Sequence, residues 1–159
     1  MGVAENLMNM SISKTPVMNE EVLYRCVRHG RKLKVKQPDG TFKLSSQAFA
    51  DPYNRPSVYR AALCNNDPSQ AQIESKDGVV SVVTHDVRLT DSVVQRDPKG
   101  RIIQKFNVDV EHVPEPENYS HAEIYIDPAS QSRGVILRLM ERLAYLANQR
   151  LWEIELRDS

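Results

Sequence analysis

Five polar residues of this chain are candidates for catalysis, because their side chains bind anions, carry a nucleophile or exchange protons. They are two arginines, one serine and two histidines: Arg25, Ser81, His85, Arg88 and His121. Arginine pairs with phosphate or carboxylate groups, and histidine gains or loses a proton near neutral pH. No G-x-S-x-G turn, glycine-rich phosphate loop or Cys-x-x-Cys pair accompanies them. The sequence therefore indicates polar clusters without a complete catalytic set, and it leaves open whether the chain is an enzyme.

Three features match the parts that ADP-ribosyltransferase-like enzymes use. Those parts are an arginine on the first strand, a strand with serine or threonine, and a late glutamate. Here they correspond to Arg25, to Ser81 in "VSVVT", and to Glu153 or Glu155. In such a site the glutamate stabilises positive charge that develops on the ribose. An ADP-ribosyltransferase-like or nucleotide-processing enzyme is therefore one functional hypothesis.

The histidines and acidic residues lack the spacing of a metal site. His85 and Asp86 form one adjacent pair, whereas a metal ion needs several ligands from fixed elements. The acidic residues between Asp109 and Asp127 lack the Asp-x-Asp-x-Asp-Gly order of a calcium loop, so we interpret them as solvated surface. For His121 we expect a hydrogen bond across neighbouring strands. We predict no bound metal and no cofactor.

A run of basic residues without any acid covers residues 25–36. Its candidate binding residues are Arg28, Arg31, Lys32, Lys34 and Lys36. On a strand the three lysines share one side and could meet the phosphates of a nucleic acid. The alternative is a solvated edge strand, whose lysines prevent pairing with another sheet. Nucleic-acid binding through residues 25–36 is a second functional hypothesis.

The composition limits the class of protein. The chain has 159 residues, a usual size for one domain, and its 21 basic residues balance its 21 acidic residues. Its two cysteines, Cys26 and Cys64, do not form a disulfide framework, so we expect reduced thiols and a cytoplasmic protein. The sequence has no run of about 20 apolar residues and no signal-peptide profile. We therefore predict a soluble protein that does not associate with membranes.

Hydrophobic patterns predict strands through the middle of the chain. A first strand is expected from Glu21, a central strand at "VVSVVT" and another strand at "HAEIYI". Hairpins are expected over residues 32–44, around "PDG", and from "SVVQR" through "DPKG" to "RIIQKFNVDVEHV". Asp67 and Pro68 predict the start of a short helix over residues 68–76. The segment "SVYRAALC" fits a strand or a helical turn, and "LWEIEL" fits an edge strand or a helical continuation.

The apolar residues of "SRGVILRLMERLAYLANQ" recur at helical spacing and predict a long helix near the end of the chain. The predicted fold class is α+β: a strand-rich mixed or antiparallel sheet with a short helix and one long C-terminal helix packed on it. Residues 1–19 are expected to form a flexible N-terminal tail and residues 20–159 a single domain. If the apolar stripe of the helix packs against a second copy instead, the chain is a homodimer.

Seven short motifs follow one another along the chain, and in this order they resemble the motifs of a group of small, largely uncharacterised bacterial proteins. They are "LYR", "SSQAF", "SVYRA", "GVVSV", "DVR", "DP" and "HAEIY", and they span residues 22 to about 126. The resemblance implies a bacterial protein but no particular activity. It singles out four polar residues: Arg25, Ser57, Arg88 and His121. We nevertheless interpret Ser57 and Arg60 as scaffold, with Arg60 paired to a carboxylate.

The leading functional hypothesis is a small intracellular bacterial accessory or adaptor protein that acts by binding another macromolecule. It rests on the presence of several polar clusters without a complete catalytic set. A protein partner would meet a surface formed by the basic hairpin and the acidic connector "PEPEN".

Overall fold

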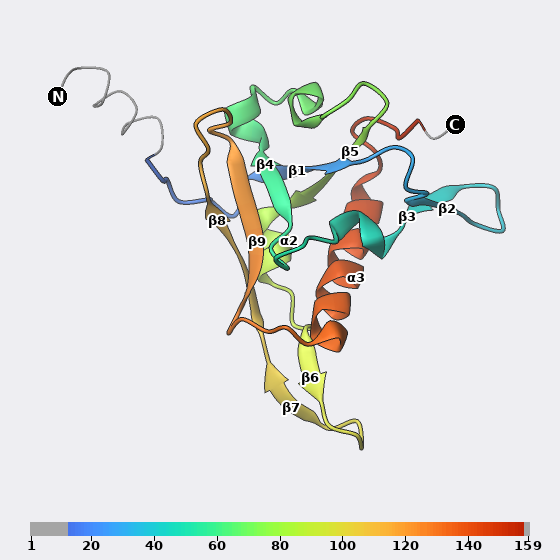
Figure 1. The fold of residues 1–159 in the computed structure, drawn as a ribbon, viewed down its shortest axis with the longest axis vertical. Helices are drawn as coiled ribbons and strands as arrows, with labels where there is room; N and C mark the ends of the chain where they lie inside the picture. The colour runs from blue at the N-terminus through green and yellow to red at the C-terminus, as the bar shows by residue number, and fades with distance from the viewer. Residues whose placement is uncertain (1–12, 158–159) are drawn as a thin grey trace.

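The computed structural model describes residues 13–157, which form an α+β domain built on an antiparallel sheet (Figure 1). The strands of this sheet are β1 (Val22–Val27), β4 (Ser57–Arg60), β5 (Gly78–Val83), β8 (Asn107–His112) and β9 (His121–Asp127). Their order is β5-β1-β4-β9-β8, and every neighbouring pair is antiparallel. The predicted α+β fold class is confirmed.

Helix α3 (Arg133–Arg150) packs its apolar face on the sheet. The buried residues of α3 are Val135, Leu139, Met140, Leu143, Ala144, Leu146 and Ala147. Together with Leu23, Val58 and Ile124 of the sheet they belong to one hydrophobic core. Ile136, which the pattern places in the stripe, is only partly buried. The face of the sheet that carries this core is called the inner face below.

Short helical turns cover the outer face of the sheet at one end. There the 3-10 turns η2 (Ala61–Cys64) and η3 (Pro68–Ala71) pack on β1 and β5. A small apolar cluster joins them: Tyr24, Ala61, Cys64, Ala71 and Val79. Over β4 and β9 the outer face carries polar side chains instead, and this part positions the candidate site.

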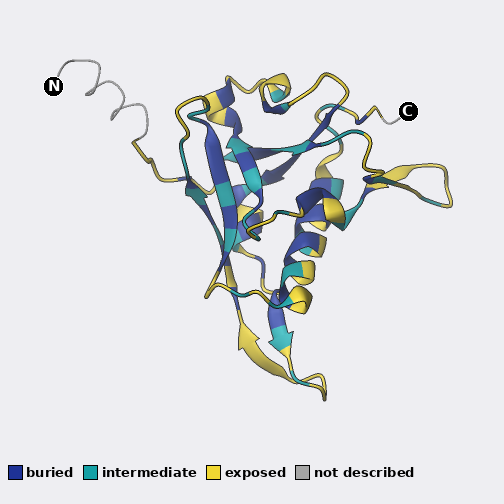
Figure 2. Ribbon diagram, viewed as in Figure 1, coloured by how far each residue is buried: buried dark blue, intermediate teal, exposed yellow. Residues whose placement is uncertain are grey.

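Both predicted hairpins are present. The first is β2 (Lys34–Lys36) with β3 (Phe42–Leu44), and the second is β6 (Val94–Arg96) with β7 (Ile102–Lys105). Their turns contain Gly40 and Gly100 at φ angles of 86° and 81°, which glycine adopts without strain. Figure 2 shows that both hairpins project from the body and are largely exposed.

Several predicted elements differ from those observed. The short helix is only η3, because no apolar stripe follows Ala71 that could bury a longer helix, although Asp67 caps its start as expected. The segment "SVYRAALC" is a strand followed by a helical turn. Strand β5 lies at an edge rather than in the centre; it is buried because α3 and the C-terminal segment cover it, with Ile154 bridged to Val79. Helices η1 (Ser46–Phe49) and α2 (Thr84–Arg88) follow from no predicted pattern.

Residues 13–19 lie against the sheet, unlike the flexible tail that the sequence predicts. Val17 is buried, and the amide of Thr15 donates to Nδ1 of His112 over 3.0 Å. Arg60 is also buried; it pairs with Glu21 at 2.8 Å and donates to Thr15 and Pro16, so Arg60 is scaffold as predicted. The rest of the predicted tail, residues 1–12, lies outside the described residues. Between residues 13 and 157, no helix has the length and apolar character needed to span a membrane.

Candidate functional site

Strands β4 and β9 carry polar side chains on the outer face. Val58 and Ala122 are fully buried on the inner face, and successive side chains of a strand alternate between faces. Ser57, His121 and Glu123 therefore point to the outer face, where the register sets Ser57 directly opposite Glu123. The antiparallel pairing of β4 with β9 thus brings together residues that are far apart in the sequence.

Ser57 and His121 are hydrogen bonded to each other. Ser57 Oγ lies 3.0 Å from His121 Nε2, and His121 Nδ1 lies 2.8 Å from the backbone carbonyl oxygen of Val113. A carbonyl oxygen only accepts, so Nδ1 donates to Val113; in the neutral tautomer that this bond selects, Nε2 accepts from the Ser57 hydroxyl. This is the orientation in which histidine can take the proton of a serine nucleophile. The expected cross-strand hydrogen bond of His121 is confirmed.

Glu115 adds a carboxylate to this pair. Its Oε1 lies 3.2 Å from Nδ1 of His121, and its side chain is 54% exposed whereas that of His121 is 8% exposed. Backbone hydrogen bonds between Glu115 and Asn118 fix the loop that holds it. A carboxylate in this position stabilises the imidazolium that forms when His121 gains a proton.

Arg55 lies beside Ser57 and is held by two glutamates. Its Nε donates to Glu123 over 2.6 Å, its Nη2 donates to Glu111, and its guanidinium stacks on the ring of Tyr125 at 4.8 Å. Burial lowers the pKa of Arg55, but the two carboxylates outweigh burial and raise this pKa above its ordinary value. Among the described residues Nη1 has no hydrogen-bond partner. Arg55 is therefore a fixed positive charge with one nitrogen available to a ligand.

These side chains line a groove of about 460 Å³ on the outer face. Its lining residues are Asp51, Pro52, Tyr53, Arg55, Ser57, Glu115, His121 and Glu123. This volume is in the range of pockets that hold small molecules. The groove can present a hydroxyl nucleophile, a proton acceptor and a positive charge to one ligand.

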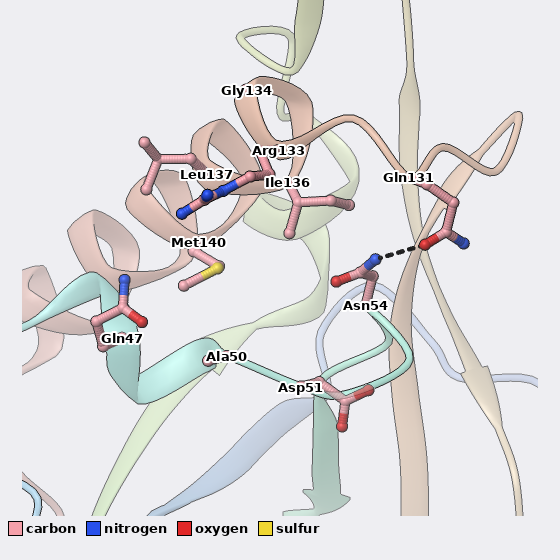
Figure 3. A pocket seen from close by; sticks show the side chains of 10 residues that line it. All are labelled: Gln47, Ala50, Asp51, Asn54, Gln131, Arg133, Gly134, Ile136, Leu137 and Met140. Carbon is pink, nitrogen blue, oxygen red and sulfur yellow. Dashed lines mark hydrogen bonds between the residues drawn. The ribbon is translucent and has the colours of Figure 1, made fainter.

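A second groove of about 380 Å³ lies between the loop after η1 and the first turns of α3 (Figure 3). Ile136, Leu137 and Met140 form its apolar wall, and Asn54 Nδ2 lies 3.4 Å from Gln131 Oε1 at one end. No serine, threonine, cysteine or histidine is among its lining residues. This second groove is therefore a poorer candidate for a catalytic site than the Ser57 groove.

Arg25 lies on the inner face and does not enter the Ser57 groove. It donates to three backbone carbonyls: Nε to Ala48 at 2.9 Å, Nη1 to Ser57 at 2.8 Å and Nη2 to Ala50 at 3.0 Å. Burial lowers its pKa. Arg25 thus holds the backbone of Ser57 from the inner face of the sheet. Its role at this groove is structural, and its side chain does not reach a ligand there.

The ADP-ribosyltransferase-like set comes together only in part. Ser81 is fully buried; it donates to Glu153 over 2.8 Å and accepts from Nε of Arg150 over 2.8 Å. Arg25 lies on the other face of the sheet, since its neighbours Leu23 and Val27 belong to the inner core. The described residues therefore do not place Arg25, Ser81 and a glutamate around one ligand.

The remaining catalytic candidates lie apart from Ser57. His85 is exposed on α2. Arg88 also lies on α2 and donates to Asp109 over 2.7 Å and to Asn19 over 2.8 Å. The histidines are dispersed, and in the part of the chain that the structure describes no three His, Cys, Asp or Glu side chains are grouped to hold a metal ion.

The predicted basic residues do not form one row. Arg28 pairs with Glu74 at 2.9 Å and with the buried Asp77 at 3.2 Å. Lys32 precedes β2 with a left-handed φ of 55°, so only Lys34 and Lys36 share a strand face. Arg31 is exposed. The acidic connector lies at the end of β8 and β9, away from the β2–β3 hairpin (Figure 1), so the two do not make the single adaptor surface that the sequence predicts.

Comparisons with protein-family models, with curated proteins and with solved structures found no match. The site therefore stands on its geometry. Sequence reasoning singled out His121 but treated Ser57 as scaffold, and it did not single out Arg55. Arg55 lies two residues before Ser57, the first residue of β4, and this spacing is the signal that could have placed both on one face.

Proposed function

We propose that this protein is an enzyme that transfers or hydrolyses acyl groups, with Ser57 as the nucleophile and His121 as the general base. The observation that carries the proposal is the 3.0 Å hydrogen bond from Ser57 Oγ to Nε2 of a histidine whose other nitrogen is fixed by a carbonyl.

The geometry supports a two-step reaction. Ser57 Oγ attacks the carbonyl carbon of an ester as Nε2 of His121 takes the hydroxyl proton. The imidazolium then gives this proton to the leaving alcohol, and the ester bond breaks to leave an acyl-serine. Water attacks the acyl group with His121 again as base, which releases the acid and restores Ser57. Glu115 stabilises the imidazolium in both steps.

The charges of the groove favour certain substrates. Nη1 of Arg55 is the available cationic donor for the oxyanion of the tetrahedral intermediate. The carboxylates of Asp51, Glu115 and Glu123 outnumber this one cation in the lining. Esters that carry a carboxylate or phosphate beside the acyl group are therefore disfavoured against neutral ones.

The test is covalent labelling with a fluorophosphonate probe and turnover of p-nitrophenyl acetate. We expect the probe to add to Ser57, as peptide mass spectrometry shows directly, and Ser57→Ala to abolish both labelling and turnover. His121→Gln removes the general base and should lower the rate by about 100-fold or more.

Ser92→Ala is the matched control, because Ser92 is exposed and has no hydrogen-bond partner among the described residues. It should keep labelling and rate within about twofold, inside the effect of an ordinary surface substitution. Circular dichroism melting of each variant separates loss of chemistry from loss of fold. If the folded wild-type protein takes no label and turns over no faster than Ser57→Ala, the pair is a structural cross-strand bond.

A further inference from the structure

The β2–β3 hairpin is a positively charged projection. Residues 31–43 contain five basic side chains and one acidic side chain, Asp39. Asp39 is held within the turn, where its Oδ1 accepts from the amide of Thr41 over 2.9 Å and from its hydroxyl over 2.6 Å. Four of the basic side chains are exposed and have no ion-pair partner among residues 13–157: Arg31, Lys32, Lys36 and Lys43. Their charge is therefore available to an anionic ligand.

The solvent side of α3 continues this charge. Arg138, Arg142 and Tyr145 follow one another at a spacing of four and three residues, so they lie on one side of the helix. The guanidinium of Arg142 stacks on the ring of Tyr145 at 5.2 Å, and Tyr145 is 55% exposed. Glu141 is the one acidic residue of α3.

The hairpin and the helix are joined at a fixed junction. The amide of Leu44 donates to Oδ1 of Asn148 over 2.9 Å. Phe42 lies two residues before Leu44 on β3, and Tyr145 lies three residues before Asn148 on α3. The two aromatic side chains thus flank one junction, roughly 7 Å along the strand on one side and roughly 5 Å along the helix on the other.

Phe42, like Tyr145, is an exposed ring beside a cation. It is 47% exposed, and Nζ of Lys34 lies 5.0 Å from the centre of its ring. Each of the two aromatics therefore combines an exposed ring with an adjacent cation. We call Lys36, Phe42, Arg138, Arg142 and Tyr145 the basic ridge.

We propose that the basic ridge binds single-stranded nucleic acid. Unpaired strands offer phosphates to lysine and arginine and unstacked bases to exposed aromatic rings, and the hairpin and α3 each supply both kinds of group. A duplex hides its base faces and could use only the charges. The ridge lies across the sheet from the Ser57 groove, so this binding does not depend on the acyl-transfer proposal.

The experiment is fluorescence anisotropy of a labelled twelve-nucleotide RNA of mixed sequence, titrated with the full chain at several salt concentrations. We expect saturable binding that weakens as salt rises. Lys36→Glu with Arg138→Glu should weaken binding by at least tenfold and reduce the log–log salt slope by about 1.4, which is the value for two lost phosphate contacts. Phe42→Ala should weaken it about fivefold or more through lost stacking.

The matched control is Lys14→Glu with Lys76→Glu, which makes the same change in net charge at exposed lysines away from the ridge. It should change the affinity by less than about threefold, because surface charges beyond a Debye length are screened. An equal loss in this control, or no binding at 100 μM protein in low salt, would overturn the proposal. Tighter binding of a duplex of the same sequence, or no effect of Phe42→Ala, would overturn the single-strand assignment.

Discussion

At the level of single residues, three arginines have different roles in this molecule, and the hydrogen-bond partners of each arginine determine its role. Arg25 donates hydrogen bonds to the carbonyls of Ala48, Ala50 and Ser57. Arg60 donates to residues of the amino-terminal segment and to Glu21. Arg55 keeps one nitrogen without a partner among the described residues, beside a serine and a histidine. A planar guanidinium that binds several carbonyls cannot be replaced by lysine without loss of some of them. Of these three arginines, Arg55 is the one placed to contact a ligand in the Ser57 groove.

Asp77 is a buried carboxylate, and we expect its ionisation to contribute to the stability of the protein in acid. Its side chain is fully buried and accepts from Nδ1 of His29 at 2.7 Å and from the amides of His29, Ile73 and Glu74. Burial raises the pKa of Asp77, but these hydrogen bonds and the charge of Arg28 outweigh burial and hold the pKa well below its usual range.

A lowered folded-state pKa means that Asp77 stabilises the fold above the unfolded-state pKa of about 4, and that this contribution is lost as pH falls below it. Asp77→Asn should cost about 3 kcal/mol at pH 7 and should flatten the decline of Tm between pH 5 and pH 2. Thermal melting of both proteins across this range measures it. An equally steep decline in Asp77→Asn would show that other carboxylates carry the acid sensitivity.

At the scale of the element, the contact between the C-terminal segment and β5 depends on the absence of one methyl group. A Cβ on Gly78 would lie 2.7 Å from Cζ3 of Trp152 and 3.0 Å from Leu156. Gly78→Ala should therefore displace residues 152–156 from the sheet and destabilise the protein by about 1 to 3 kcal/mol. Trp152 is the single tryptophan, and its displacement into water should shift the fluorescence emission to longer wavelength.

Gly134→Ala is the control: a Cβ there meets nothing within 4 Å, and the substitution should add about 0.5 kcal/mol to the free energy of unfolding. Unchanged emission in Gly78→Ala would contradict the predicted displacement.

Elements with local signals could be predicted from the sequence, whereas the candidate site could not. The apolar spacing of α3 and the glycine turns of both hairpins are local properties, and they predicted those elements correctly. The Ser57 groove depends on the pairing of β4 with β9, which are separated by 60 residues, and on the carbonyl of Val113 that orients His121. Strand order and a hydrogen-bond tautomer are non-local properties, and no pattern within either segment encodes them.

At the scale of the whole molecule, one core connects segments from both ends of the described chain. Val17 of the amino-terminal segment, Leu156 of the C-terminal segment and Leu139 of α3 belong to the same buried cluster. A shared core of this kind makes the unfolding of its parts interdependent. Whether residues 13–157 unfold together as one domain can therefore be tested by measuring the cooperativity of unfolding.

We predict one cooperative transition for the full chain. Thermal unfolding followed by Trp152 fluorescence reports the C-terminal segment, and far-ultraviolet circular dichroism reports the sheet and α3. Because both depend on the one core, their midpoints should coincide within about 1 °C, and the van't Hoff enthalpy should equal the calorimetric enthalpy. Gly78→Ala should separate the two midpoints, since it releases the segment that carries Trp152 while β1, β4 and β9 remain paired. Two separate transitions in the wild-type protein would mean that the C-terminal segment unfolds independently, and that the core which packs α3 on the sheet does not depend on Leu156.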